Sequence, residues 1–127
     1  MASARHDDVP QVLIVEDEWL IADMIARTVS EAGYGALGPV PTTAQAAALL
    51  ADHRCDAALL DLNLGGTKGY ALIDRLRGLG IPHLLVTGYS REDLPERYRS
   101  CAMLGKPLVP ETLLAALRTL LSPSPAA

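Results

Sequence analysis

Residues 11–18 read QVLIVEDE, a short apolar run that leads directly into three acidic side chains. A continuous apolar run of this kind is typical of a strand that is covered on both faces, as the strands of parallel sheets are. The stretch therefore predicts a buried strand over Gln11–Val15 with carboxylates at its carboxyl end.

The rest of the chain repeats this pattern. Further short apolar runs predict strands at 36–40, 56–60, 82–86 and 101–104. Apolar positions at helical spacing predict helices at 20–32, 42–52, 69–77 and 110–121, with a polar, weakly helical stretch at 91–99. This alternation predicts an α/β fold with a five-stranded parallel sheet and helices on both faces. We expect one domain over 11–121 and flexible ends at 1–10 and 122–127.

The composition restricts the class of protein. The chain has 127 residues, 50% hydrophobic and 20% charged, which is enough apolar material for the core of one domain. It has no apolar stretch of about 20 residues and no signal-peptide pattern at its N-terminus, so we expect neither a membrane span nor secretion. The net charge of −4, without a block rich in Lys or Arg, argues against binding to nucleic acid. Cys55 and Cys101 are interpreted as buried thiols of a cytoplasmic protein rather than zinc ligands.

Polar side chains follow four of the five predicted strands. They are Glu16 and Asp17 after the first strand, Asp61 after the third, Thr87 after the fourth and Lys106 after the fifth. Each has an ordinary explanation by itself, as a cap, a turn residue, a loop residue or a solvated side chain. Because the carboxyl ends of parallel strands meet at one edge, where such folds bind ligands, their coincidence predicts a single site.

These residue types favour phosphoryl transfer. Crowded carboxylates repel one another, and a hard divalent cation such as Mg²⁺, which prefers oxygen ligands, relieves that repulsion. An ionised carboxylate can act as the nucleophile and form an aspartyl phosphate. Lys106 would then supply positive charge and Thr87 a hydrogen bond to the phosphoryl oxygens.

The motifs that carry these residues resemble those of response-regulator receiver domains. They are VLIVEDE at 12–18, LLDLNLGG at 59–66, VTGYS at 86–90 and GKP at 105–107, and the resemblance spans about residues 11–121. It implies a doubly wound, flavodoxin-like (βα)5 fold, Mg²⁺ as the cofactor, and phosphorylation by a sensor histidine kinase.

The resemblance also implies a role for each site residue. Asp61 resembles the phosphoacceptor, and Glu16 and Asp17 resemble the acidic pair that holds Mg²⁺ together with Asp61. The backbone carbonyl of Asn63 resembles the remaining protein ligand of the metal. Thr87 and Lys106 resemble the pair that contacts the phosphate, and the bond before Pro107 is expected to be cis.

The stretches VTGYS, LPERYR and LGKP resemble a receiver subgroup named for its FATGY motif, in which the fourth-helix region is short or irregular. Leu85 and Val86 stand where that motif has Phe-Ala, and Leu108 stands where Phe commonly follows Lys-Pro. Met103 occupies the position of the aromatic switch residue of ordinary receivers. We therefore hypothesise that the chain signals differently, by ordering of the segment 88–100.

Four functions are compatible with these residues. The first is a stand-alone response regulator that binds a downstream protein when phosphorylated; no helix-turn-helix is present, so we expect no DNA binding by this chain. The second is a phosphate sink or shuttle, which passes the group to a phosphotransferase. The third is a hydrolase, against which Asn63 argues because it stands where related enzymes have a second Asp. The fourth is an adaptor that is never phosphorylated, against which the intact site argues.

Several other features have ordinary interpretations. The GxGxxG match at 33–38 follows a helix, which is the wrong context for a dinucleotide site. Residues 65–69 are expected to form a mobile loop beside Asp61. His53 and His83 have no partner at metal-ligand spacing. Trp19 is interpreted as a partly exposed residue near the site, open to burial or to contact with a kinase helix, and Tyr89 and Tyr98 are open to packing or partner contact.

Overall fold

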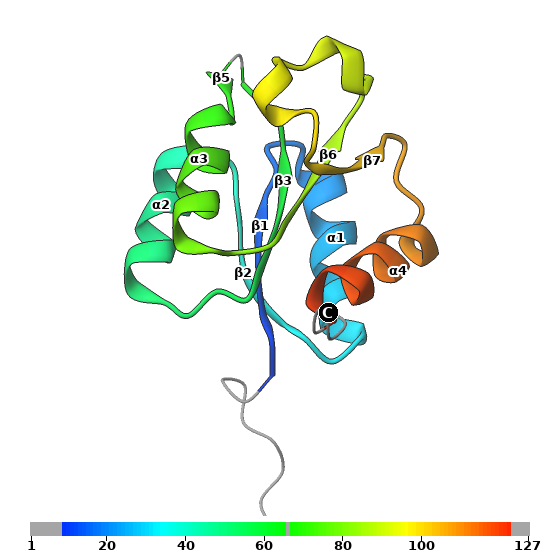
Figure 1. Cartoon of the computed structure of the whole chain (residues 1–127). Helices are drawn as coiled ribbons and strands as arrows, with labels where there is room; N and C mark the ends of the chain where they lie inside the picture. Colours follow the sequence, from blue (N-terminus) through cyan, green and yellow to red (C-terminus); the bar gives the residue numbers. More distant parts are fainter. Residues whose placement is uncertain (1–8, 66, 123–127) are drawn as a thin grey trace, which may run out of the picture.

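The computed structural model describes residues 9–65 and 67–122, and its centre is a five-stranded parallel sheet (Figure 1). The strand order is β2-β1-β3-β6-β7. Each strand pairs in parallel with its neighbours, as Leu59 of β3 does with Leu84 of β6. The bounds are β1 (Gln11–Val15), β2 (Gly35–Val40), β3 (Ala57–Asp61), β6 (His83–Thr87) and β7 (Ala102–Gly105).

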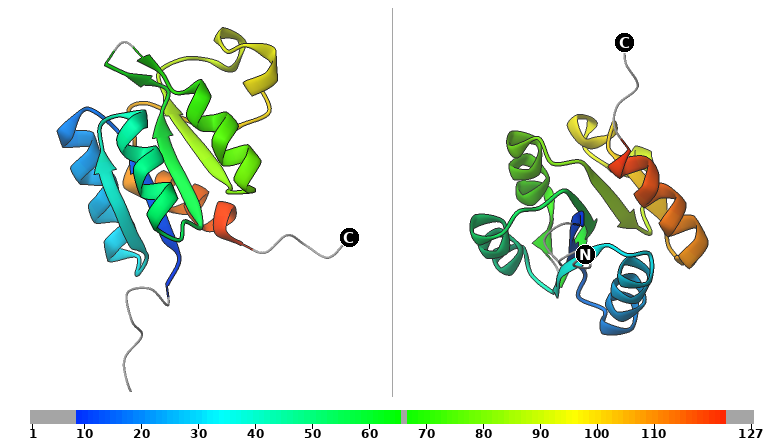
Figure 2. Two further views of the ribbon diagram at one scale, coloured as in Figure 1. Left: turned by 90° about the vertical axis from the view of Figure 1, so that its left-hand side faces the viewer. Right: turned by 90° about the horizontal axis from the view of Figure 1, so that it is seen from below.

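Two helices cover each face of the sheet. Helices α1 (Trp19–Glu31) and α4 (Pro110–Leu121) lie on one face, and α2 (Thr43–Asp52) and α3 (Tyr70–Leu79) lie on the other, as both views in Figure 2 show. Side chains alternate between these faces along each strand, so that Leu60 packs toward α3 while Leu59 packs toward α4. This burial on both sides explains why the central strands β1, β3 and β6 are almost continuously apolar.

Local signals set several helix ends. The Thr42 hydroxyl accepts a hydrogen bond of 3.1 Å from the N–H of Gln45 and caps α2. Helix α3 ends at Gly80, whose φ of 71° is a left-handed conformation that favours glycine. Pro110 begins α4, where its missing N–H costs no helical hydrogen bond.

The segment 91–99, predicted to be weakly helical, has only short helical turns. It forms two 3-10 helices, η2 (Arg91–Asp93) and η3 (Glu96–Tyr98). Pro95 explains the break, because it lacks an N–H and disfavours a helical conformation at Leu94, whose ψ is 150°. The described residues therefore contain four α-helices rather than the five of a full (βα)5 pattern. The expected doubly wound parallel sheet is otherwise confirmed.

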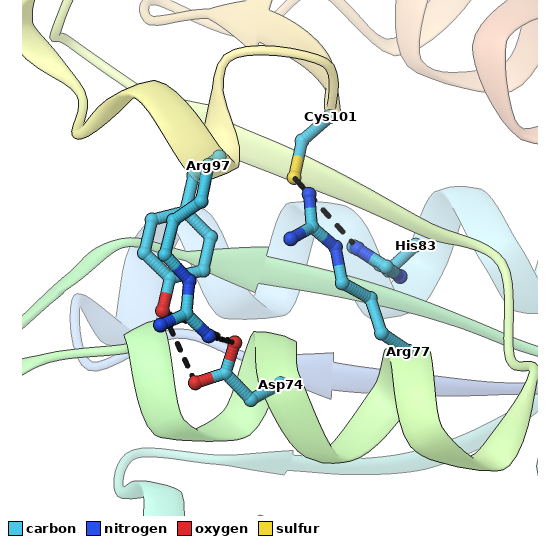
Figure 3. A network of polar contacts seen from close by, with 6 residues as sticks. Asp74, Arg77, His83, Arg97 and Cys101 are labelled. Atoms are coloured by element: carbon cyan, nitrogen blue, oxygen red, sulfur yellow. Dashed lines mark hydrogen bonds and ion pairs between the residues drawn. The ribbon is translucent and has the colours of Figure 1, made fainter.

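Side chains anchor this segment to α3 (Figure 3). The ring of Tyr98 stacks on that of Tyr70, with 4.6 Å between their centroids, and its hydroxyl donates to Asp74 at 3.1 Å. Arg97 also donates to Asp74, at 2.5 Å. Nearby, a nitrogen of Arg77 donates to the Cys101 sulfur at 3.5 Å. A dashed line marks this contact in Figure 3. Packing against α3 thus holds a segment that has little helical hydrogen bonding of its own.

A small hairpin after β3 was not predicted from the sequence. It consists of β4 (Asn63–Leu64) and β5 (Thr67–Lys68), which pair in antiparallel fashion, Asn63 opposite Lys68. It replaces the simple loop expected at 65–69, of which residue 66 lies outside the described part of the chain. The hairpin projects from the same edge of the sheet as the end of β3 (Figure 1).

The remaining expectations concern the chain ends, the thiols and the GxGxxG match. Of the expected flexible ends, 1–8 and 123–127 lie outside the described residues. Cys101 is buried but Cys55 is only half-buried, which corrects the expectation for Cys55, and both thiols are free. Residues 33–38 run from the end of α1 into β2, as expected. None of the helices in the described part of the chain combines the length and apolar character needed to cross a bilayer.

Candidate functional site

The side chains predicted to form a site meet at the carboxyl edge of the sheet. Asp61 is the last residue of β3 and Thr87 the last of β6, while Glu16 and Lys106 directly follow β1 and β7. Strands β1, β3, β6 and β7 run in parallel, so their ends come together. A cleft of about 460 Å³ opens here, lined by Asp17, Glu18, Asp61, Asn63, Gly65, Thr87, Gly88, Tyr89 and Lys106.

The carboxylate of Asp61 is buried and held at both oxygens. The residue is only 5% exposed. Its Oδ2 accepts a hydrogen bond of 3.0 Å from Nζ of Lys106, and its Oδ1 accepts one of 3.0 Å from the N–H of Asn63. Asp61 is therefore a fixed anionic group whose carboxylate borders the cleft.

Glu16 is a second buried carboxylate in this site. Its Oε2 accepts from the N–H of Glu18 at 3.1 Å, and its Oε1 lies 3.2 Å from Nζ of Lys106. Burial raises the pKa of Glu16 to about 7, and the negative charge of Asp61 adds to this rise. The Glu18 N–H and the Lys106 ammonium offset the effect only in part.

Lys106 is the cation between these two carboxylates. Burial by itself would lower the pKa of its ammonium, but the hydrogen bond and charge of Asp61, helped by Glu16, outweigh burial and raise it. Lys106 therefore stays charged. Its backbone N–H donates to the backbone carbonyl of Thr87 at 3.0 Å. The peptide bond between Lys106 and Pro107 is cis.

Three acidic residues could hold a metal ion. Glu16, Asp17 and Asp61 each offer a carboxylate oxygen, and these oxygens lie within 4.8 Å of one another. Oε1 of Glu16 is ion-paired with Lys106 but accepts no hydrogen bond from the residues that the structure describes. An all-oxygen donor set with an unsatisfied buried oxygen and excess negative charge fits a hard divalent cation.

Thr87 and Met103 lie on the neighbouring strands β6 and β7. Thr87 is buried, and its Oγ1 accepts a hydrogen bond of 3.0 Å from the N–H of Tyr89. Met103 pairs with Leu85, is half-buried, and packs with the apolar cluster on the α2 and α3 face. No aromatic ring occupies that position, as the sequence shows.

The structure places the other singled-out residues outside the centre of the site. His53 is exposed on the end of α2, and Nδ1 of His83 lies 2.9 Å from the carbonyl of Ile81. Tyr98 is buried, so the packing interpretation holds for that ring. Trp19 is 75% exposed, which excludes its burial within this chain.

Sequence reasoning missed one contact at the mouth of the cleft. The ammonium of Lys68 lies 4.2 Å from the centre of the Tyr89 ring and donates a hydrogen bond to its hydroxyl. Lys68 belongs to the hairpin that the apolar pattern does not predict. Its partner lies 21 residues away along the chain, so no local spacing signal could have revealed the pair.

Known proteins share both the sequence pattern and the fold. A family model described as the response regulator receiver domain matches residues 12–118. The phosphate regulon transcriptional regulatory protein PhoB of Pseudomonas aeruginosa is 35% identical over 117 residues, which cover 87% of this chain and 51% of PhoB. The chain spans about half the length of the curated relatives it matches.

Solved structures agree with this match. The solution structure of SdrG from Sphingomonas melonis Fr1 is 37% identical with a TM-score of 0.77, covering 90% of this chain and 98% of that one. The receiver domain of the PhyR response regulator from Erythrobacter litoralis is 27% identical with a TM-score of 0.80, covering 94% of this chain and 96% of that one. The chain belongs to the response regulator receiver domain family.

Proposed function

We propose that this chain accepts a phosphoryl group on Asp61 from the phosphohistidine of a sensor histidine kinase. The observation that carries the proposal is the environment of Asp61. Its buried carboxylate borders an open cleft, Lys106 contacts one oxygen, and the Asn63 N–H fixes the other. An ionised carboxylate in this setting needs no general base to act as a nucleophile.

The transfer is a simple exchange of bonds. An oxygen of Asp61 forms a bond to phosphorus while the bond between phosphorus and the donor nitrogen breaks, and the donor imidazole keeps that electron pair. Lys106 remains positively charged beside the oxygens on which charge accumulates. The Thr87 hydroxyl accepts its hydrogen bond from Tyr89, which leaves its own proton available to a phosphoryl oxygen.

Mg²⁺ is the cofactor that the acidic cluster best fits. Glu16, Asp17 and Asp61 would hold it with the backbone carbonyl of Asn63, and water would fill its other positions. When bound, the ion neutralises the negative charge that the carboxylates and the phosphoryl group share.

The phosphorylated chain would act in the cytoplasm through protein contacts. We favour a stand-alone regulator of the FATGY-motif subgroup that binds a downstream protein. The alternative is a phosphate sink or shuttle, which passes the phosphoryl group on to a phosphotransferase. It begins with the same transfer to Asp61. The irregular η2–η3 segment and the half-buried Met103 in place of an aromatic switch residue support this subgroup.

Intact-mass spectrometry tests the proposal. The protein is incubated with Mg²⁺ and acetyl phosphate, alone and after addition of a purified histidine kinase. We expect one phosphoryl adduct in the wild type and in Asp52→Asn, which changes an exposed carboxylate on α2. We expect none in Asp61→Asn or with a chelator. An adduct that persists in Asp61→Asn, or no adduct in the wild type with either donor, would overturn the proposal.

A further inference from the structure

Lys68 contacts Tyr89, a residue that lines the cleft at Asp61. Lys68 belongs to the β4–β5 hairpin that follows β3, and Tyr89 belongs to the loop that follows β6. These two segments lie side by side above the carboxyl edge of the sheet (Figure 1). Tyr89 lines the cleft together with Asp61, and it is 37% exposed, so it contacts both the cleft and solvent.

Each end of this contact is linked to a residue of the site. Lys68 pairs with Asn63 across the hairpin, and the N–H of Asn63 donates to Asp61. On the other side, the N–H of Tyr89 donates to the hydroxyl of Thr87. The contact therefore joins the hairpin whose Asn63 N–H contacts Asp61 to the loop whose Tyr89 N–H contacts Thr87.

The contact combines two attractions between exposed groups. The Lys68 ammonium lies 4.2 Å from the centre of the Tyr89 ring, which is within the range of a cation–π interaction, and it also donates to the hydroxyl. Contacts of this kind at exposed sites are weak enough to open readily, yet strong enough to shift how often the ring covers the cleft.

We propose that Lys68 is a positioning residue that keeps the Tyr89 ring over the cleft and so slows the access of water and small phosphodonors to Asp61. This inference rests on the proposed function. In that setting, Lys68 and Tyr89 set the lifetime of the phosphorylated state without touching the reacting atoms.

The two reactions that the contact slows share one entrance. In phosphorylation by acetyl phosphate, an Asp61 oxygen bonds to phosphorus and acetate leaves with the electron pair of the broken bond. In hydrolysis, a water oxygen bonds to phosphorus and the Asp61 carboxylate keeps the electron pair, while a proton of the water is released with inorganic phosphate. Both acetyl phosphate and water reach Asp61 through the cleft that the Tyr89 side chain lines.

The test follows both rates by intact-mass spectrometry on the full chain with Mg²⁺. Acetyl phosphate loads the protein, and its removal by desalting starts the decay of the adduct. We expect Lys68→Met and Tyr89→Leu each to raise both rates about two- to fivefold, the range that an exposed cation–π contact can supply. Lys68→Arg keeps a cation over the ring and should stay close to the wild type. The double variant should be no faster than either single variant, because the two residues act as one unit.

Arg118→Met is the matched control. It removes one exposed positive charge from α4, as Lys68→Met does from the hairpin, and should leave both rates unchanged. If the wild type forms the Asp61 adduct but Lys68→Met alters neither rate, or only one, the inference is wrong while the proposed function stands. Additive effects in the double variant also contradict it. If the wild type forms no adduct with either donor, the proposed function itself fails.

Discussion

At the scale of single residues, the site contains more buried negative charge than its one ammonium can balance. Lys106 lies 3.0 Å from Asp61 and 3.2 Å from Glu16, and Asp17 adds a third carboxylate nearby. The pKa of Glu16, about 7, is raised mainly by burial and further by the negative charge of Asp61. Without a bound cation, the repulsion among these carboxylates therefore destabilises the folded protein.

This imbalance predicts how stability depends on pH in a chelating buffer. Glu16 has a pKa of about 7 in the folded protein and a reference value of 4.5, so the folded state binds this proton more tightly than the unfolded chain. Its contribution to the free energy of unfolding is therefore largest below about 4.5 and falls as the pH rises to about 7. In Glu16→Gln this fall should shrink by on the order of 1–3 kcal/mol.

Urea unfolding between pH 5 and pH 8 measures this difference. Glu31→Gln, which neutralises an exposed carboxylate at the end of α1, is the control and should follow the wild type. Parallel pH profiles for the wild type and Glu16→Gln would contradict the prediction.

At the scale of elements, the segment between β6 and β7 depends on side chains for its conformation. Leu94 and Tyr98 are buried against α3, and Arg97 reaches Asp74 on the same helix. Two isolated 3-10 turns have few hydrogen bonds of their own, so these contacts are what hold the segment in place. The segment is thus packed before any phosphorylation, and it begins only a few residues after Thr87.

This arrangement predicts where phosphorylation changes the structure. A phosphoryl group that draws on the Thr87 hydroxyl would disturb the Tyr89 N–H bonded to it, and the change would pass into the packed segment. We expect amide hydrogen exchange, measured with and without phosphorylation, to change more in 88–100 than in α4 (Pro110–Leu121), which serves as the internal comparison. Equal protection of 88–100 in both states would rule this out.

At the scale of the whole molecule, stability comes from two apolar layers on opposite faces of one sheet. Leu113 and Leu117 of α4 are fully buried, and they pack with Ile14, Leu59 and Leu84 of the sheet. Leu60 and Leu85 face the opposite layer with α3. Neither layer can be lost without exposing the strands that carry the site.

Truncation of a core leucine tests this dependence. Leu117→Ala should lower the free energy of unfolding by about 2–5 kcal/mol, since it leaves a cavity between α4 and the sheet. Leu79→Ala is the matched control, because Leu79 is 55% exposed, and it should change stability by less than about 1 kcal/mol. Urea unfolding at one pH compares the two variants. Equal losses in the free energy of unfolding would show that the buried Leu117 side chain stabilises the protein no more than the exposed Leu79 side chain does.

The sequence by itself determined the parallel sheet and the set of residues at its carboxyl edge. The apolar runs show which strands are buried on both faces, and the helices between them require parallel connections. Once the strands are parallel, their ends must meet, so Asp61, Thr87 and Lys106 come together whatever the details of the loops. This part of the structure depends on patterning along the chain.

Only the tertiary structure decided the hairpin after β3, the two 3-10 turns, the contact between Lys68 and Tyr89, and the charge balance at Glu16. These features depend on how closely residues far apart in the chain approach and on how much water they lose. Desolvation and packing are properties of the assembled molecule, and neither is encoded in the spacing of residue types.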